Sequence, residues 1–338
     1  MDTQLMARTA AAMVAPGRGL LAADESAGTC ERRFQEAGVE CTVETRRAYR
    51  ELLFATPGIS DFVSGVILFD ETIRQRTSDG IPIPTYLTQN GIIPGIKVDT
   101  GAKPLALALD EEVTEGLDGL RTRLADYFGL GARFAKWRAV ISIGADIPST
   151  GCIEANAHAL ARYGALCQEA SIVPIFEPEV LLDGDHSIDR CLEVSEAVLR
   201  ATFTAAIEQR VSLEYMILKS SMVLSGKNVT HRSGVAQVGK QTMRCLMRAV
   251  PASLPGIVFL SGGQSDLEAT AHLDAINRLG SAPWPLTFSF SRALQSTALK
   301  VWGGNAANVT AAQATFHHRA RMNSLASLGQ WSSDLESA

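Results

Sequence analysis

Short apolar runs recur along the whole chain, and their alternation with helical patterns constrains its fold more than any other feature. About eight runs are rich in Val, Ile, Leu and Phe, at residues 19–24, 62–70, 91–99, 133–143, 171–179, 214–224, 256–263 and 286–291. Near-continuous runs of this kind are typical of parallel strands that are covered on both faces. Amphipathic helical patterns lie between them, at residues 44–54, 110–128, 153–169, 188–210, 235–249, 267–279 and 293–302.

About eight strand–helix units in 338 residues predict an α/β fold, a (β/α)8 TIM barrel. A doubly wound sheet is the alternative fold with the same alternation. No low-complexity linker or block of charge divides the chain. We therefore expect a single domain over residues 1–338, with a polar, mobile tail from about residue 330.

Composition argues against several classes of protein. The formal net charge of -5 gives no basic footprint for nucleic acid. No segment of about 20 residues is apolar enough to span a membrane, and the N-terminus lacks the pattern of a secretory signal. The six cysteines are scattered without a C-x-x-C pair, and the six histidines are dispersed. We therefore expect a cytoplasmic protein with reduced thiols and no metal site.

A lysine interrupts the sixth apolar run. Lys219 follows three apolar residues, and a buried ammonium group there is costly unless it is paired or loses its proton. Burial and nearby cations lower the pKa of a lysine amine, which makes the amine a nucleophile near neutral pH. Lys219 is therefore a candidate for a Schiff-base lysine. The alternative is a structural lysine that pairs with a carboxylate or extends to the strand end.

Polar residues gather where the predicted strands end. In a barrel, side chains alternate between the interior and the helix layer, and reacting groups lie at the carboxyl ends of the strands. The polar residues at these ends are Asp24, Glu25, Ser26, Lys97, Asp99, Lys136, Arg138, Glu177, Glu179, Ser261, Ser289, Ser291 and Arg292. Any one of them alone could be a salt bridge or a strand cap. Together they predict mixed acids and bases at one barrel mouth, where close charges separate each other's pKa values.

The turn after the seventh predicted strand favours an oxyanion site. Gly262 and Gly263 let backbone N–H groups converge on a phosphate, and barrels often bind phosphate after strands seven and eight. Arg292 follows on the eighth strand and could give a bidentate contact. An ordinary tight turn is the alternative for the two glycines. A second anionic group could be held across the mouth by Lys97, Ser26 and Thr29.

Seven ordered segments at successive strand ends resemble the class I fructose-1,6-bisphosphate aldolase family. They are LAADES (21–26), GIKVD (95–99), AKWR (135–138), PIFEPE (174–179), LK (218–219), FLSGGQS (259–265) and RALQ (292–295). The resemblance implies a lyase of glycolysis and gluconeogenesis that reversibly cleaves fructose 1,6-bisphosphate to dihydroxyacetone phosphate and glyceraldehyde 3-phosphate. It implies a lysine imine, no cofactor and no metal, and it also implies a homotetramer.

The resemblance also implies roles for single residues. Lys219 would form the imine at C2 of the substrate, and Glu177 would be the acid and base for making and hydrolysing it. Asp24 would take the C4 hydroxyl proton as the C3–C4 bond breaks. Lys136 would favour the uncharged, nucleophilic form of the Lys219 amine and orient intermediates, and Glu179 would balance charge. The substrate would be bound at its C1 phosphate by Ser261, Gly262, Arg292 and the Ser291 N–H, near its C6 phosphate by Ser26, Thr29, Lys97 and Arg138, and elsewhere by Ser289.

Several positions depart from the family pattern. Thr29 and Arg32 stand where a serine and a lysine are usual, Ser220 replaces a proline, and Ser291 replaces a glycine. Many family members end in a tyrosine that exchanges a proton on the enamine, and residues 330–338 contain none. We hypothesise that an acid inside the barrel or a bound water takes its place.

Two alternative functions remain open. Another imine-forming barrel enzyme, such as a transaldolase-like transferase, would not need two phosphate sites. A binding or scaffold protein on the same barrel would not need Lys219, Glu177 and Asp24 together.

Overall fold

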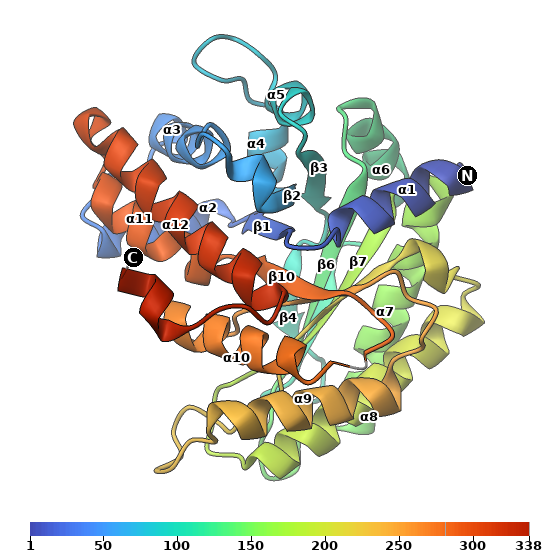
Figure 1. Cartoon of the computed structure of the whole chain (residues 1–338). Coiled ribbons are helices and arrows are strands. Elements are labelled where there is room, and N and C mark those ends of the chain that lie inside the picture. Colours follow the sequence, from blue (N-terminus) through green and yellow to red (C-terminus); the bar gives the residue numbers. More distant parts are fainter. Residues whose placement is uncertain (281, 338) are drawn as a thin grey trace.

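A closed barrel of eight parallel strands forms the centre of the molecule, with helices around it (Figure 1). The computed structural model describes residues 1–280 and 282–337. The barrel strands are β1 (Gly19–Ala23), β2 (Val63–Leu68), β3 (Ile93–Lys97), β6 (Phe134–Ile141), β7 (Val173–Val180), β8 (Ile217–Ser220), β9 (Ile257–Phe259) and β10 (Leu286–Phe290). They pair in this order, and β10 pairs with β1. The predicted (β/α)8 barrel is therefore confirmed, and the doubly wound sheet is excluded.

Most of the helices expected from the sequence are present. These are α3 (Val43–Phe54), α7 (Thr150–Glu169), α8 (Ile188–Glu208), α9 (Val235–Ala249), α10 (Asp266–Arg278) and α11 (Arg292–Trp302). Helices that the sequence did not indicate are α1 (Thr3–Met13), α2 (Ala27–Glu36), α4 (Asp70–Ile73), α5 (Ile83–Gln89) and α12 (Val309–Ser327). The helix α12 packs against α3, α10 and α11, so its apolar residues lie on several sides. The helical periodicity of apolar residues in its sequence is therefore weak. None of the helices in the described residues is long and apolar enough to cross a membrane.

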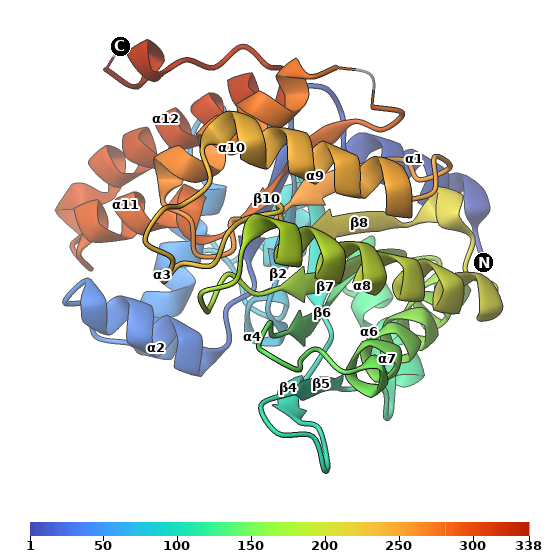
Figure 2. The same ribbon diagram turned by 90° about the horizontal axis from the view of Figure 1, so that it is seen from below.

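The helix predicted over residues 110–128 is wrong in its first half. The strands β4 (Gly101–Pro104) and β5 (Glu112–Glu115) form an antiparallel hairpin there, which stands away from the barrel in Figure 2. The helix α6 begins only at residue 120 and ends at residue 129. Glu111 accepts hydrogen bonds from the N–H and the hydroxyl of Ser149, both at 2.6 Å, at the start of α7. The Glu111 carboxylate therefore lies at the start of α7 and not within the helix predicted over residues 110–128.

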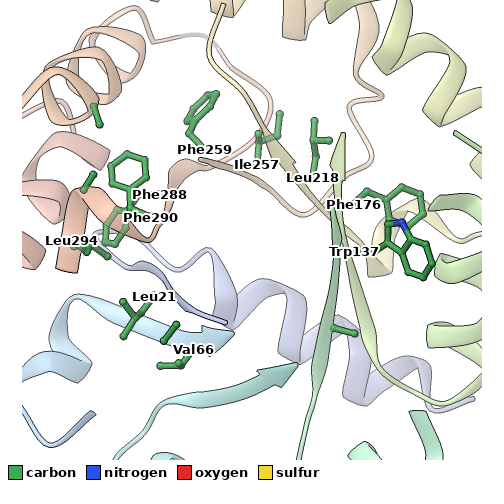
Figure 3. Close-up of a cluster of buried hydrophobic side chains, with 14 of the residues drawn as sticks. Leu21, Val66, Trp137, Phe176, Leu218, Ile257, Phe259, Phe288, Phe290 and Leu294 are labelled. Carbon is green, nitrogen blue, oxygen red and sulfur yellow. The ribbon is translucent and has the colours of Figure 1, made fainter. Parts of the chain in front are cut away.

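Alternation along each strand separates the helix layer from the barrel interior. Trp137 and Phe176 point outward from β6 and β7 into the helix layer (Figure 3). Inward residues near the strand starts form an apolar floor with α1. The floor contains Leu20, Phe134, Ile175, Ile217 and Val258 from the strands and Met6 and Met13 from α1. Gly95 makes room for this floor, because a Cβ at that position would lie 2.2 Å from the Phe134 ring. The next inward positions on β6, β7 and β8 carry Lys136, Glu177 and Lys219. These charged residues therefore lie directly above the apolar floor.

The strand predicted over residues 214–224 is shorter in the structure. A 3-10 helix spans Leu213–Tyr215, and β8 ends one residue after Lys219. Beyond it, the hydroxyl of Ser221 accepts the N–H of Val180 at 3.1 Å and donates to the carbonyl of the same residue at 3.0 Å. This side chain continues the contact between β7 and β8 after the strand pairing stops. Lys219 therefore sits at the carboxyl end of its strand.

The C-terminal segment, residues 330–337, runs back along α10 and α12 (Figure 2). It ends in a 3-10 helix, Ser333–Ser337. The carboxylate of Glu336 accepts two hydrogen bonds from the Arg319 guanidinium and one from the Trp331 indole, each at 2.7 Å. These contacts anchor the segment, and the mobility predicted for it stays a prediction.

We expect Glu336→Gln to loosen this segment, because an amide lacks the charge that strengthens its bonds to Arg319. The expected cost is about 1–2 kcal/mol, which corresponds to a roughly 5- to 30-fold faster amide hydrogen exchange within residues 330–337. Asp334→Asn changes an exposed carboxylate of the same segment and is the matched control. Equal exchange in the two variants would show that Glu336 does not hold the segment.

Candidate active site

All of the site residues predicted from the sequence line one cavity at the carboxyl ends of the barrel strands. The cavity has a volume of about 810 Å³. The predicted residues in its wall are Asp24, Ser26, Thr29, Lys97, Lys136, Arg138, Glu177, Glu179, Lys219, Ser261, Gly262, Ser289, Ser291 and Arg292. The structure thus brings together residues from β1, β3, β6, β7, β8, β9 and β10 and from the segments that follow them.

Two lysines and two carboxylates form a buried chain of alternating charge above the apolar floor. The Nζ atom of Lys219 lies 2.9 Å from Oε1 of Glu177. The Nζ atom of Lys136 lies 3.0 Å from Oε2 of Glu177 and 2.8 Å from Oδ2 of Asp24. None of the four side chains is more than 10% exposed. The interior tolerates these four charges because each has a partner of opposite sign. Lys219 is paired with a carboxylate and also lines the cavity.

The alternation of positive and negative groups also sets the protonation states of Asp24, Glu177 and Lys136. Burial raises the pKa of Asp24, but the ammonium groups of Lys136 and Lys219 more than offset it and lower that pKa from 3.8 to about 2. Burial likewise raises the pKa of Glu177, while Lys136, Lys219 and Arg138 lower it below its usual value. Burial lowers the pKa of Lys136, and the two carboxylates outweigh that effect and raise it. At neutral pH, Asp24 and Glu177 are therefore ionised and Lys136 is protonated.

One oxygen of Glu177 is available for chemistry. Lys136 lies within ion-pair distance of Oε2, yet this buried oxygen accepts no hydrogen bond of good geometry within residues 1–280 and 282–337. The hydroxyl of Ser289, which also lines the cavity, has no hydrogen-bond partner in the same part of the chain. Buried polar atoms without a partner are uncommon in native proteins. The hydrogen-bonding capacity of both atoms is therefore not used by the described residues.

Two more ion pairs form the wall beside this chain. The amine of Lys97 donates to Oδ1 of Asp99 at 2.5 Å and to the Asp99 carbonyl at 2.8 Å. The second carboxylate oxygen of Asp99 accepts the backbone N–H of Arg138 at 3.2 Å. The Arg138 side chain bonds Glu179 through Nε. The salt-bridge alternative is thus confirmed for Asp99, which joins β3 to β6 and holds Lys97 at the cavity.

The turn after β9 has the backbone needed for an oxyanion site. Gly262 and Gly263 have φ angles of 52° and 85°, a left-handed conformation that favours glycine. A Cβ on Gly263 would lie 3.9 Å from Nη2 of Arg292, so this guanidinium group faces the turn. Within the described residues, Arg292 forms no ion pair and its side chain no hydrogen bond. Gly262 and Arg292 both line the cavity, so the turn and the guanidinium group lie close together in its wall.

Sequence reasoning missed Arg33, which also lines the cavity. Its Nη1 atom bonds Glu25 and donates to the Ser291 hydroxyl at 3.0 Å. Arg33 lies on α2, a helix that the sequence did not indicate. The available signal was its spacing of four residues from Thr29, which places both side chains on one helical face.

Comparison with known proteins identifies the family. The family described as fructose-bisphosphate aldolase class-I matches residues 5–338. The chain belongs to the class I fructose-bisphosphate aldolase family. A probable class 1 fructose-bisphosphate aldolase of Xanthomonas campestris pv. campestris is 59% identical over 332 residues, which is 98% of this chain and 99% of that relative. Cytosolic fructose-bisphosphate aldolase 4 of Arabidopsis thaliana is 49% identical, over 95% of this chain and 82% of that relative.

A solved structure agrees with these relatives. The fructose-bisphosphate aldolase of Plasmodium falciparum, in a ternary complex with TRAP and a small-molecule inhibitor, matches with a TM-score of 0.96 and 46% identity. The match covers 97% of this chain and 95% of that chain. The resemblance to class I aldolases, which rested on seven short segments, is thus confirmed over nearly the whole length.

Proposed function

We propose that the protein is a class I fructose-bisphosphate aldolase that reversibly cleaves fructose 1,6-bisphosphate to dihydroxyacetone phosphate and glyceraldehyde 3-phosphate. The observation that carries the proposal is the buried amine of Lys219, which lies 2.9 Å from Glu177 and faces the cavity. The same cavity presents Arg292 and Lys97, which can bind two phosphate groups. A coupled assay of dihydroxyacetone phosphate release from fructose 1,6-bisphosphate tests this proposal, and absence of turnover would overturn it.

In the proposed mechanism, imine formation needs a neutral amine and a group that moves protons. Glu177 takes a proton from the Lys219 ammonium group, and the free amine attacks C2 of the open-chain ketose. Glu177 then carries protons from the nitrogen to the former carbonyl oxygen, which leaves as water. A protonated imine remains, and the carboxylate of Glu177 is restored. The distance of 2.9 Å between Oε1 of Glu177 and the Lys219 amine supports this role.

Cleavage uses the protonated imine as an electron sink. Asp24 accepts the C4 hydroxyl proton as the C3–C4 bond breaks, and the bonding electrons form an enamine on Lys219. The aldehyde product carries the C6 phosphate away. An acid inside the barrel or a bound water then protonates C3, and the proton that Asp24 took returns to restore this donor. Hydrolysis of the imine, with Glu177 again moving protons, releases dihydroxyacetone phosphate. Lys136 lies between the two carboxylates and holds them in position, and Glu179 balances the charge of Arg138.

The two phosphates are assigned to two sets of residues in the cavity wall. The glycine turn after β9 and Arg292 lie close together and suit the C1 phosphate, since they present backbone and guanidinium N–H groups together. The groups proposed for the C1 phosphate are Ser261, Gly262, Arg292 and the Ser291 N–H, and those for the C6 phosphate are Ser26, Thr29, Lys97 and Arg138. The buried hydroxyl of Ser289 is proposed to bind a substrate hydroxyl.

We expect Glu177→Gln to lower kcat for fructose 1,6-bisphosphate by about 10²- to 10⁴-fold, because an amide cannot carry protons between nitrogen and oxygen. Trapping of the dihydroxyacetone phosphate imine by borohydride should still label Lys219, but more slowly. Glu154→Gln, at an exposed glutamate of α7, is the matched control. A Glu177→Gln variant with wild-type kcat would remove Glu177 from the mechanism.

We also propose a cytoplasmic, single-domain homotetramer. The Arabidopsis relative is named cytosolic, and one closed barrel supports a single domain. The tetramer rests on the family resemblance alone. Sedimentation of the purified protein measures it directly. No observation favours a transaldolase-like enzyme, which would act on ketose monophosphates, or a scaffold protein.

A further inference from the structure

Ser291 links the end of β10 to α2 and to the segment after β1 in a way that its sequence position did not suggest. It follows β10 directly and precedes α11, where the family pattern has glycine. We expected only its backbone N–H to serve the substrate. Its hydroxyl, however, donates to Oε1 of Glu25 at 2.8 Å and accepts Nη1 of Arg33 at 3.0 Å. Glycine could form neither hydrogen bond.

Glu25 is held firmly by its neighbours. Besides the Ser291 hydroxyl, its Oε1 atom accepts hydrogen bonds from Arg33 and from the Gln295 amide at 3.2 Å. The nearly fully buried Arg50 donates to the Glu25 backbone carbonyl at 2.7 Å and lies 3.9 Å from Oε2. Because the Glu25 side chain is only 8% exposed, these contacts fix it in one place. Glu25 is therefore a stable support for groups that bind to it.

Arg33 uses only one of its nitrogens to bind this support. The Nη1 atom contacts both Glu25 and Ser291, whereas Nε and Nη2 form no hydrogen bond with the part of the chain that the structure describes. The side chain is 23% exposed and lines the cavity beside Thr29. A guanidinium group held by one nitrogen presents its others to a phosphate in a fixed direction. Arg33 and Thr29 lie four residues apart on α2, so Arg33 shares one helical face with a residue assigned to the C6 phosphate.

We propose that Ser291 is a specificity-determining positioning residue: with Glu25, its hydroxyl holds Arg33 in place as a contact for the second phosphate of a ketose bisphosphate. The proposal rests on the aldolase function proposed above. An arginine that is ordered before binding loses less side-chain freedom when it meets the phosphate, so the affinity for bisphosphates rises. A ketose 1-phosphate lacks the second phosphate and gains nothing from this arrangement.

The test compares kcat/KM for fructose 1,6-bisphosphate and for fructose 1-phosphate. We expect Ser291→Ala to lower the ratio of the two values about 3- to 10-fold, mainly through a higher KM for the bisphosphate. Ser291→Thr keeps the hydroxyl and should restore the ratio. Ser296→Ala, five residues further on and within α11, is the matched control and should leave the ratio unchanged. Equal losses for the two sugars in Ser291→Ala would overturn the proposal, since a purely structural serine would affect both alike.

A double-mutant cycle identifies Arg33 as the route of the effect. In an Arg33→Met background, Ser291→Ala should no longer change the ratio. A ratio that still falls in this background would show that the hydroxyl acts through another group. If the wild-type protein cleaves neither sugar, the aldolase function itself fails. If it cleaves both but Ser291→Ala keeps the wild-type ratio, only the role of Ser291 fails.

Discussion

Lys219→Met should lower kcat for fructose 1,6-bisphosphate on the order of 10⁵-fold or more, the scale on which loss of a covalent nucleophile acts in well-studied enzymes. Methionine has a similar length but no amine, so no imine can form and the C3–C4 bond loses its electron sink. Borohydride added with dihydroxyacetone phosphate should leave a covalent adduct on the wild-type protein and none on the variant. Peptide mass spectrometry locates the adduct.

The matched control is Lys240→Met, which changes an exposed lysine of α9 in the same way. It should keep both turnover and the adduct. Thermal unfolding of both variants checks that the barrel still folds, and Glu177 keeps Lys136 as an ion-pair partner when Lys219 is replaced. An adduct found on Lys136 instead of Lys219 would move the imine to β6, on the other side of β7. Full-rate cleavage by the Lys219 variant would contradict the proposed function outright.

Much of the site follows from the alternation of side chains along the strands, which repeats every two residues. Once eight apolar runs are read as parallel strands, alternation places Lys136, Glu177 and Lys219 on the barrel interior, and the barrel brings the strand ends together. The ion pair between Lys219 and Glu177 joins neighbouring strands, so the sequence could indicate it. The charge alternation itself was not predictable, because its effect depends on distances between side chains on different strands.

The elements that the sequence missed share a different physical origin. The helix α12 packs on three sides, which removes the one-sided pattern that marks an amphipathic helix. The β4–β5 hairpin lies where a helix was predicted, and Glu111 beside it accepts a hydrogen bond from Ser149, 38 residues away, which the local pattern does not show. The hydrogen bond between Arg33 and Ser291 spans 258 residues of chain. Contacts of this kind arise only when the barrel closes.

Asp24→Asn should separate the two halves of the reaction. We expect kcat for cleavage to fall about 10³- to 10⁴-fold, because an amide cannot accept the C4 hydroxyl proton. Imine formation with dihydroxyacetone phosphate needs no such proton acceptor, so borohydride should still label Lys219. Asp79→Asn, at an exposed aspartate, is the control for the substitution itself. Loss of labelling in Asp24→Asn would mean that Asp24 acts before the imine forms or that the site has collapsed.

The Asp24→Asn variant also tests the stabilisation of the Asp24 carboxylate by the neighbouring lysines. The measurement is the free energy of unfolding as a function of pH. In the folded protein the pKa of Asp24 is lowered from 3.8 to about 2, so its ionised form stabilises the fold. The contribution is about 2 kcal/mol at neutral pH, is complete above about pH 4 and disappears as the pH falls through about 2. Asparagine does not titrate, so urea unfolding should show wild-type and Asp24→Asn stabilities converging between these pH values. A difference that stays constant down to about pH 2 would mean that Lys136 and Lys219 do not stabilise the Asp24 carboxylate.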